Sequence, residues 1–334
     1  MPVTKSNGST RAPTFRNTAS FVSGWNVSVS DTLFADGGVP HGGTNPRYCL
    51  DIEPNSPTDL IRHVRILGCT FRNARNVAVG AIWCKDVSLD DCRLTAGPDT
   101  AQGILLNTSY CDITIANSSF DGTSYFGCYI RQVASYGQGW PQPTSAFLHD
   151  EGVNSRLLLN NNRFLQVGAE LQGHTAIVRN NNFLNSPKAV FVMAPFGVVE
   201  HNVLTNCGWA DPNGGRYAAL CIGYNTDKRR RYLVSHNLVR FSESYLSKEL
   251  LQAVNPAKYY GIFIQEINAE IQLIGNRSEG FYRFPDTKGQ PRNINYFRDW
   301  SSPLLPPADA TTQTRVIQGN SYGGPDWVPE TPFG

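Results

Sequence analysis

Charge is scarce in this chain of 334 residues. Only 17% of the residues are charged, and neither sign dominates, because 29 Lys and Arg stand against 27 Asp and Glu. A chain without a basic excess lacks the electrostatic footprint of a general nucleic-acid binder. No apolar run approaches the ~20 residues that span a membrane, and the polar stretch 1–20 does not resemble a signal peptide. We therefore expect no nucleic-acid partner and no membrane span.

Motifs for metal and phosphate chemistry are also missing. The eight cysteines are scattered through apolar segments without metal-ligand spacing. We expect them to be buried, reduced thiols, and a disulfide set, as in a secreted protein, is the alternative. The chain has no phosphate-binding loop, no Ser-His-Asp order in a supporting context and no metal constellation. The sequence thus predicts no metal and no cofactor.

Turn-forming residues, in contrast, are abundant. The chain has 30 Gly, 21 Pro and 28 Asn. These residues form helices poorly and favour turns. The composition therefore predicts an all-β protein with short strands and many turns, and 40% hydrophobic residues suffice for a sizeable core.

A short pattern recurs along the chain: a β-type run, then Asn or Cys, one variable residue and an apolar residue. Each recurrence up to residue 239 is followed by a second apolar strand, as in 77–85, 102–109 and 167–174. The repeated position is occupied by Cys69, Cys92, Ser118, Asn162, Asn182, Asn202, Asn237, Asn276 and Asn320, and Thr32 takes it in a degenerate first coil. Internal repeats of about 20 residues with one residue type in register predict a solenoid.

The predicted fold is a single-stranded right-handed parallel β-helix with an Asn/Cys ladder and inserted loops. Stacked coils place equal positions about 4.8 Å apart, so each inward amide can donate to the next one along the stack. The alternative is a set of Asn-rich turns in a β-sandwich or propeller. Such antiparallel folds do not require the same residue in every coil.

The repeat makes the sequence similar to the right-handed parallel β-helix (pectin-lyase-like) superfamily, which includes pectate and pectin lyases, polygalacturonases and phage tailspikes. The similarity covers residues 20–322. A local segment, Leu50-Asp51-Ile52-Glu53-Pro54-Asn55, resembles the DIEP segment near the start of β-helix domains in phage tail proteins. The exposed sheet does not supply the several carboxylates of a lyase-type Ca²⁺ site, which is a departure from the lyase pattern.

Three parts of the chain are expected. A polar lead-in covers 1–20, the β-helix domain covers 21–322, and a Pro-rich tail covers 323–334. Loop insertions are expected near 133–156, 205–217, 240–258 and 279–314. Within the third of these, apolar residues at helical spacing in 242–254 predict a short helix packed outside the coil.

Strand alternation predicts which side chains face outward. If Ile82 and its counterparts in later coils point inward, Trp83, Arg131 and Gln172 point outward, as do Tyr129 and Glu170 on the other side. If Ile52 precedes Ile82 in the same row, Asp51 and Glu53 lie on one face about 6.6 Å apart. Two carboxylates at that separation can act as acid and base in glycoside cleavage. The alternative is a turn in which Asp51 caps and Pro54 restricts Glu53.

A second cluster of candidates lies in the first insertion and on the strands beside it. His149, Asp150 and Glu151 belong to the loop, and Glu170 and Arg131 belong to neighbouring strands. A carboxylate crowded by another carboxylate has a raised pKa and suits a general acid, whereas Arg131 suits an anionic sugar or the base of a β-elimination. A solvated acidic loop is the alternative reading. Predicted catalytic residues are Asp51, Glu53, Asp150, Glu151 and Glu170, and predicted sugar-binding residues are Tyr129, Arg131, Trp140, His149, Gln172 and Trp83.

The resemblance implies a phage tailspike-like protein that binds and cleaves host surface polysaccharide, by carboxylate-assisted hydrolysis or by β-elimination. It further implies a homotrimer, contacts with other phage tail proteins, and a place in the virion tail, extracellular after lysis. Two alternatives stay open. One is a non-enzymatic glycan-binding adhesin or structural tail component. The other is a free, secreted bacterial pectinase-like hydrolase, lyase or epimerase.

Overall fold

Strands and turns make up the described part of the protein, which contains no helix. The computed structural model describes residues 14–15, 19–37, 48–54, 60–74, 77–97, 103–123, 127–133, 155–209, 217–223, 230–241, 259–264, 269–279, 284–285, 291–292, 297–299 and 315–323. No described segment is a helix long and apolar enough to cross a membrane. The helix expected within 242–254 and the tail after residue 323 lie outside these residues.

One sheet has eleven strands, and every neighbouring pair in it is parallel. In spatial order its strands are β1 (Thr14–Phe15), β4 (Leu33–Ala35), β7 (Thr70–Ala74), β9 (Arg93–Ala96), β11 (Ser119–Asp121), β14 (Arg163–Leu165), β17 (Asn182–Leu184), β20 (Val203–Thr205), β23 (Leu238–Arg240), β26 (Arg277–Glu279) and β31 (Ser321–Gly323). Each strand thus pairs with the corresponding strand of the next repeat.

The second sheet is curled and consists of two rows of parallel strands. Its first row contains β2 (Ala19–Phe21), β5 (Tyr48–Ile52), β12 (Cys128–Val133), β15 (Val167–Leu171), β18 (Val190–Val192), β21 (Tyr217–Ile222), β24 (Tyr259–Ile264) and β29 (Phe297–Asp299). Its second row contains β3 (Ser28–Ser30), β6 (Ile61–Leu67), β13 (Arg156–Asn160), β16 (Thr175–Arg179), β19 (Phe196–Glu200), β22 (Arg230–Ser235), β25 (Ala269–Ile274) and β30 (Arg315–Gln318). The long strands β8 (Val77–Asp90) and β10 (Ile104–Ala116) run through both rows and join them.

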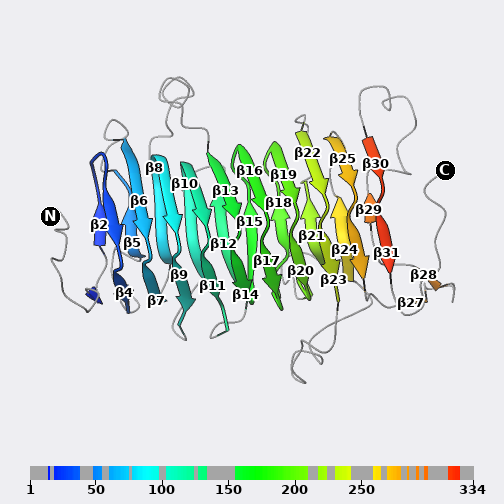
Figure 1. The fold of residues 1–334 in the computed structure, drawn as a ribbon, viewed down its shortest axis with the longest axis horizontal. Helices are drawn as coiled ribbons and strands as arrows, with labels where there is room; N and C mark the ends of the chain where they lie inside the picture. Colours follow the sequence, from blue (N-terminus) through cyan, green and yellow to red (C-terminus); the bar gives the residue numbers. More distant parts are fainter. Residues whose placement is uncertain are drawn as a thin grey trace.

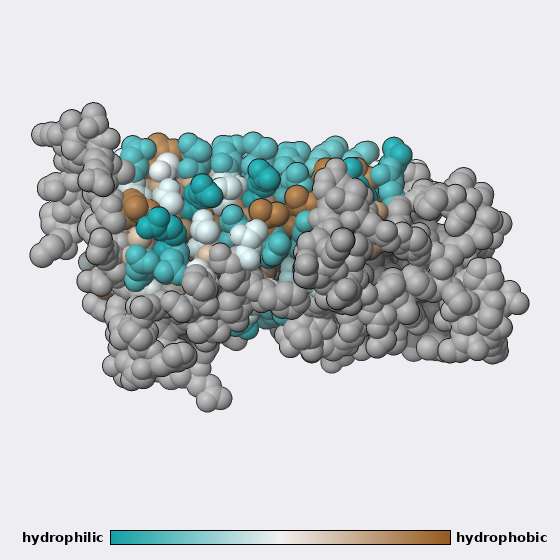
Figure 2. Space-filling view, turned by 90° about the horizontal axis from the view of Figure 1, so that it is seen from below, coloured by the Kyte–Doolittle hydropathy of each residue, from teal (hydrophilic) through white to brown (hydrophobic). Residues whose placement is uncertain are grey.

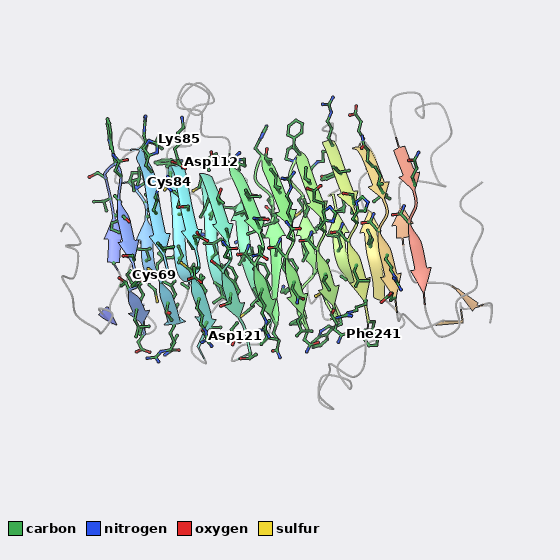
Figure 3. The ribbon with its side chains drawn as sticks, in the orientation of Figure 1. Cys69, Cys84, Lys85, Asp112, Asp121 and Phe241 are labelled. Atoms are coloured by element: carbon green, nitrogen blue, oxygen red, sulfur yellow. The ribbon has the colours of Figure 1, made fainter. Side chains whose placement is uncertain are left out.

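The strands follow one another along the long axis of the molecule, from blue to red in Figure 1. Only the short pair β27 (Phe284–Pro285) and β28 (Pro291–Arg292) is antiparallel among the described strands. The architecture is therefore all-β, with parallel strands in curled sheets, and it is compatible with a solenoid-like fold. Side chains at one edge, including Lys85 and Asp112, lie far from those at the opposite edge, including Asp121 and Phe241 (Figure 3).

A row of asparagines, buried except for the half-buried last one, runs through the repeats. From one side chain to the next, the amide nitrogen donates to the following amide oxygen at 2.9–3.0 Å. The row consists of Asn162, Asn181, Asn202, Asn237, Asn276 and Asn320. Each amide also satisfies a backbone carbonyl, as Asn202 does with Val178 at 2.8 Å. Buried polar groups need such partners, so the row is a structural element of the interior.

The prediction that Asn182 belongs to this row is wrong by one residue. Asn181 is buried and bonded to Asn202, whereas Asn182 is exposed and pairs in register with Arg163. The reason is the aromatic stack two residues further on, where Phe164 and Phe183 lie with ring centroids 4.3 Å apart. Since alternate residues of a strand face the same side, the stacked rings determine the register of the Asn row.

Asparagine has a second use at the corners of the strands. Asn117, Asn161 and Asn180 all have positive φ, between 51° and 56°, and occupy successive turns. Asn tolerates this left-handed conformation better than other non-Gly residues because its short amide can bond locally. The side chains of these corner residues also bond to exposed partners, for example Asn161 to Asn117 at 2.7 Å. The Asn excess therefore reflects two rows, one buried and one at the corners.

The eight cysteines are all free and buried, which confirms the prediction of buried thiols. Cys69 and Cys92 continue the Asn row toward the N-terminus, and each thiol donates to a backbone carbonyl, of Val29 and Ile66 respectively. Burial raises the pKa of the Cys207 thiol to about 12. A thiol that stays protonated in an apolar interior is inert, so Cys207 acts as a small core residue.

Candidate functional site

A row of polar side chains lies on the outer face of the curled sheet. Asp51 on β5 pairs in register with Gly80 on β8, which pairs with Asn107 on β10. Asn107 pairs with Arg131 on β12, and Arg131 pairs with Glu170 on β15. In-register neighbours of a parallel sheet point to one side and lie about 4.8 Å apart. We call these five residues the polar row.

Alternation along each strand places the polar row outward. The neighbours of Asp51, Leu50 and Ile52, are fully buried in the core. Around Glu170, Ala169 and Leu171 are likewise buried core residues. Because successive side chains of a strand point to opposite faces, Asp51 and Glu170 face away from the core. This confirms the outward prediction for Asp51, Arg131 and Glu170.

Asp51 and Glu53 form the first candidate pair. Glu53 follows β5 directly, and its backbone N–H donates to the carbonyl of Phe21 at 3.0 Å. Burial, and secondarily the charge of Glu53, raises the pKa of Asp51 from 3.8 to about 7. Asp51 Oδ1 is buried and makes no hydrogen bond. A carboxylic acid that keeps its proton near neutral pH, beside a second carboxylate, has the properties of a general acid.

The raised pKa of Asp51 predicts a pH-dependent stability. Between about pH 4 and 7 the native state holds a proton that the unfolded chain releases, so the free energy of unfolding falls as the pH rises. The loss amounts to about 2–4 kcal/mol over this window. Asp51→Asn removes it, because a neutral amide does not titrate. Urea unfolding should give the variant the same free energy of unfolding as the wild type near pH 4 and a higher one near pH 8. An equal difference between the two proteins at both pH values would contradict the prediction.

An aromatic ring lies on the glycine of the polar row. A Cβ atom added to Gly80 would stand only 2.8 Å from Cε1 of Tyr48, so the ring packs directly against the backbone of β8. Tyr48 belongs to β5, three residues before Asp51. The ring therefore lies beside Asp51 on the outer face, where Gly80 makes room for it. Aromatic faces beside hydrogen-bonding groups are what sugar rings bind.

Arg131 and Glu170 form the other end of the polar row, and Gln172 lies two residues after Glu170. Glu170 Oε1 accepts a short hydrogen bond from the amide of Gln172. Arg131 lies in register beside Glu170, but its buried Nε makes no hydrogen bond. The carboxylate is thus held by a neutral amide directly after its own strand. The Nε of Arg131 is therefore a buried donor without an acceptor.

Further polar atoms lie unbonded on this face. Asn107 Oδ1 and Ser109 Oγ are buried without a hydrogen-bond partner, and Ser109 is only 1% exposed. The two residues are separated by one position on β10 and face the same side. Native structures rarely leave buried polar atoms unpaired without a reason, and a ligand is one such reason.

The prediction that Trp83 faces outward to bind sugar is wrong. Trp83 is fully buried and packs with Leu60 and Ile82 in a small separate cluster. The cause is a corner in β8, where Trp83 has a φ of 48° and interrupts the alternation. The predicted register also differs by one residue here, since Ile52 pairs with Ala81 and not with Ile82.

The structure brings some of the predicted residues together and separates others. Asp51 and Glu53 are neighbours, and Tyr129, Arg131, Glu170 and Gln172 form a second group. Four strand spacings, about 19 Å, separate Asp51 from Glu170, so these two carboxylates cannot act on one bond. Trp140, His149, Asp150 and Glu151 lie outside the described residues.

Sequence reasoning missed several residues of this face as site residues: Tyr48, Gly80, Asn107, Ser109 and Lys188. The sequence does contain a signal for Tyr48 and Gly80, because an aromatic residue near Asp51 in one repeat is followed by a glycine in the next repeat. The other signals depend on register, which sequence alone leaves uncertain by one residue.

No protein-family model matches the chain, and no curated protein matches it. In the described part of the chain, no group of three or more His, Cys, Asp and Glu side chains is placed to hold a metal ion. The described surface in Figure 2 is mainly hydrophilic, with hydrophobic residues in small groups. The polar row and its surroundings are therefore the candidate functional site of the described residues.

Proposed function

We propose that this protein is a phage tailspike-like, pectin-lyase-like right-handed parallel β-helix that binds host surface polysaccharide and hydrolyses it. The observation that carries the proposal is the Asp51–Glu53 pair, in which Asp51 has a pKa of about 7 next to a second carboxylate on an outward-facing strand end. The stacked Asn row and the parallel register support the fold. A homotrimer in the virion tail, in contact with other tail proteins, belongs to the same proposal.

In the proposed reaction Asp51 is the general acid. Its proton passes to the glycosidic oxygen as the bond to the anomeric carbon breaks, while ionised Glu53 removes a proton from the attacking water. Residues two apart on one strand face have Cβ atoms about 6.6 Å apart, which leaves room for the water and favours inversion at the anomeric carbon. Tyr48 stacks on a sugar ring beside the scissile bond.

Incubation of the protein with a panel of bacterial surface polysaccharides tests the proposal. We expect new reducing ends and no ultraviolet absorbance of unsaturated uronates, because hydrolysis adds water whereas elimination forms a double bond. Absorbance together with new reducing ends would indicate a lyase and contradict the acid/base roles. Binding without any cleavage would indicate an adhesin instead.

The aromatic platform gives a separate prediction for binding. Gly80→Ala displaces the Tyr48 ring, because the new methyl group would stand 2.8 Å from Cε1 of that ring. We expect the affinity for the polysaccharide that serves as substrate to fall about 3- to 10-fold, as loss of one aromatic contact implies. Tyr48→Phe keeps the ring and serves as the control in calorimetric titration. Wild-type affinity in Gly80→Ala would show that the ring does not contact sugar.

A further inference from the structure

The outer face of β12 carries two cations that no described carboxylate pairs with. Arg131 belongs to the polar row, and its Nε is buried and unbonded. Lys188 lies before β18, and its stem crosses Gly168, where an added Cβ would stand 2.5 Å from Cβ of Lys188. The Lys188 ammonium reaches the ring of Tyr129 on β12, with Nζ 5.3 Å from the ring centroid. Both cations thus converge on one strand.

The arrangement differs from the ion pairs elsewhere on the described surface. Arg156 bonds to Asp112 at 2.8 Å, and Arg231 bonds to Glu270 at 2.8 Å. Arg131 has a carboxylate in register on the next strand, yet Glu170 is bonded to Gln172 instead. Among the described residues, Glu170 is thus bonded to an amide and not to the guanidinium, and a buried donor without a partner is costly unless a ligand supplies an acceptor.

We infer that Arg131 and Lys188, on either side of Tyr129, form a subsite for a sugar that carries a carboxylate. This inference rests on the proposed function and names its substrate class, an acidic polysaccharide. The planar fork of Arg131 matches a carboxylate in two parallel hydrogen bonds, Lys188 adds a second charge, and the Tyr129 ring offers a face for the sugar. A carboxylate adds charge to the hydrogen bonds that the hydroxyl groups of a neutral polysaccharide can also accept from Arg131.

The register places this subsite relative to the Asp51–Glu53 pair. Three strand spacings separate β12 from β5, about 14 Å along the stack. A polysaccharide bound at both places therefore runs parallel to the long axis of the molecule. The acidic sugar is held a few residues away from the bond that is cleaved.

Glycan binding to the full chain tests the inference without relying on cleavage. The probes are alginate oligosaccharides, in which every sugar carries a carboxylate, the same oligosaccharides after carboxyl reduction, and a panel of acidic and neutral bacterial capsular polysaccharides. We expect the bound glycans to be acidic and to lose binding on carboxyl reduction. Dextran sulfate beside dextran distinguishes sulfate from carboxylate as the recognised group, and preference for sulfate would overturn the carboxylate assignment.

Variants connect the selectivity to these two residues. Arg131→Gln should weaken binding of acidic glycan about 10- to 100-fold, as expected for one charged hydrogen-bonding partner. The affinity of Arg131→Lys for acidic glycan should lie between those of Arg131→Gln and the wild type. Lys188→Met, which keeps the stem over Gly168, should lose less affinity than Arg131→Gln. Arg156→Gln is the matched control, since its guanidinium is already paired with Asp112. Circular dichroism verifies that each variant is folded.

The outcomes separate this inference from the function on which it rests. Equal binding of neutral and acidic glycans, with Arg131→Gln unchanged, would overturn the acidic subsite and leave the proposed function intact. A wild-type protein that binds no glycan in the panel would overturn both.

Discussion

Asp51→Asn is expected to lower the rate of polysaccharide hydrolysis about 10²- to 10⁴-fold, the range that one general acid contributes. The amide has nearly the shape of the protonated carboxyl group but cannot deliver a proton to the leaving oxygen. Binding should change little, so the loss appears in kcat and not in KM. Counting reducing ends against time over a range of substrate concentrations measures both constants.

A matched control is Asp121→Asn. Asp121 lies on β11 of the eleven-stranded sheet, at the edge of the molecule opposite Lys85 (Figure 3). Its carboxylate accepts a hydrogen bond from the Thr123 hydroxyl. We expect wild-type activity in this variant. Glu53→Gln should be as damaging as Asp51→Asn, and the double variant should be hardly worse than either, because acid and base act in one step. Full activity in Asp51→Asn would remove this residue from the mechanism.

Asn181→Ala is expected to reduce the free energy of unfolding by about 3–5 kcal/mol, whereas Asn182→Ala should change it by less than about 0.5 kcal/mol. Asn181 Oδ1 accepts bonds from the backbone and the side chain of Asn162, at 2.9 and 3.0 Å. Its Nδ2 donates to Leu159 and Asn202. Truncation leaves these buried groups unbonded, while the exposed Asn182 side chain loses only contacts with water.

Urea unfolding, followed by circular dichroism, compares the two variants under one condition. Adjacent residues of the same type make a stringent pair, because composition and helix or strand propensity are identical. Equal destabilisation by the two substitutions would mean that the buried row does not pass through Asn181. Greater destabilisation by Asn182→Ala than by Asn181→Ala would restore the register that the sequence predicts.

Periodicity is the part of the fold that sequence reasoning predicts best. The all-β class and the buried positions of Thr32, Cys69, Cys92 and Ser118 follow from a pattern that recurs in every repeat, and the structure confirms them. Periodicity does not identify the buried residue in the run of three asparagines at 180–182. All three residues fit the pattern, and only the packing of Phe183 on Phe164 selects Asn181.

Alternation works for the site only within straight strands. It places Asp51, Arg131 and Glu170 outward correctly because each of them lies between two buried neighbours on its strand. It fails at Trp83, because the positive φ of this residue turns a corner inside β8. A corner of this kind leaves no sequence signal when the residue is neither Gly nor Asn.

The sequence by itself determined that strands repeat, that one row of small polar residues is buried in successive repeats, and that Asp51 and Glu53 share a strand end. These properties depend on local chemistry and on spacing along the chain. Only the tertiary structure decided which residues lie side by side across strands, because a shift of one residue in register exchanges the two faces of a strand. The meeting of Tyr48 with Gly80, of Arg131 with Glu170 and of Lys188 with Tyr129 depends on that register.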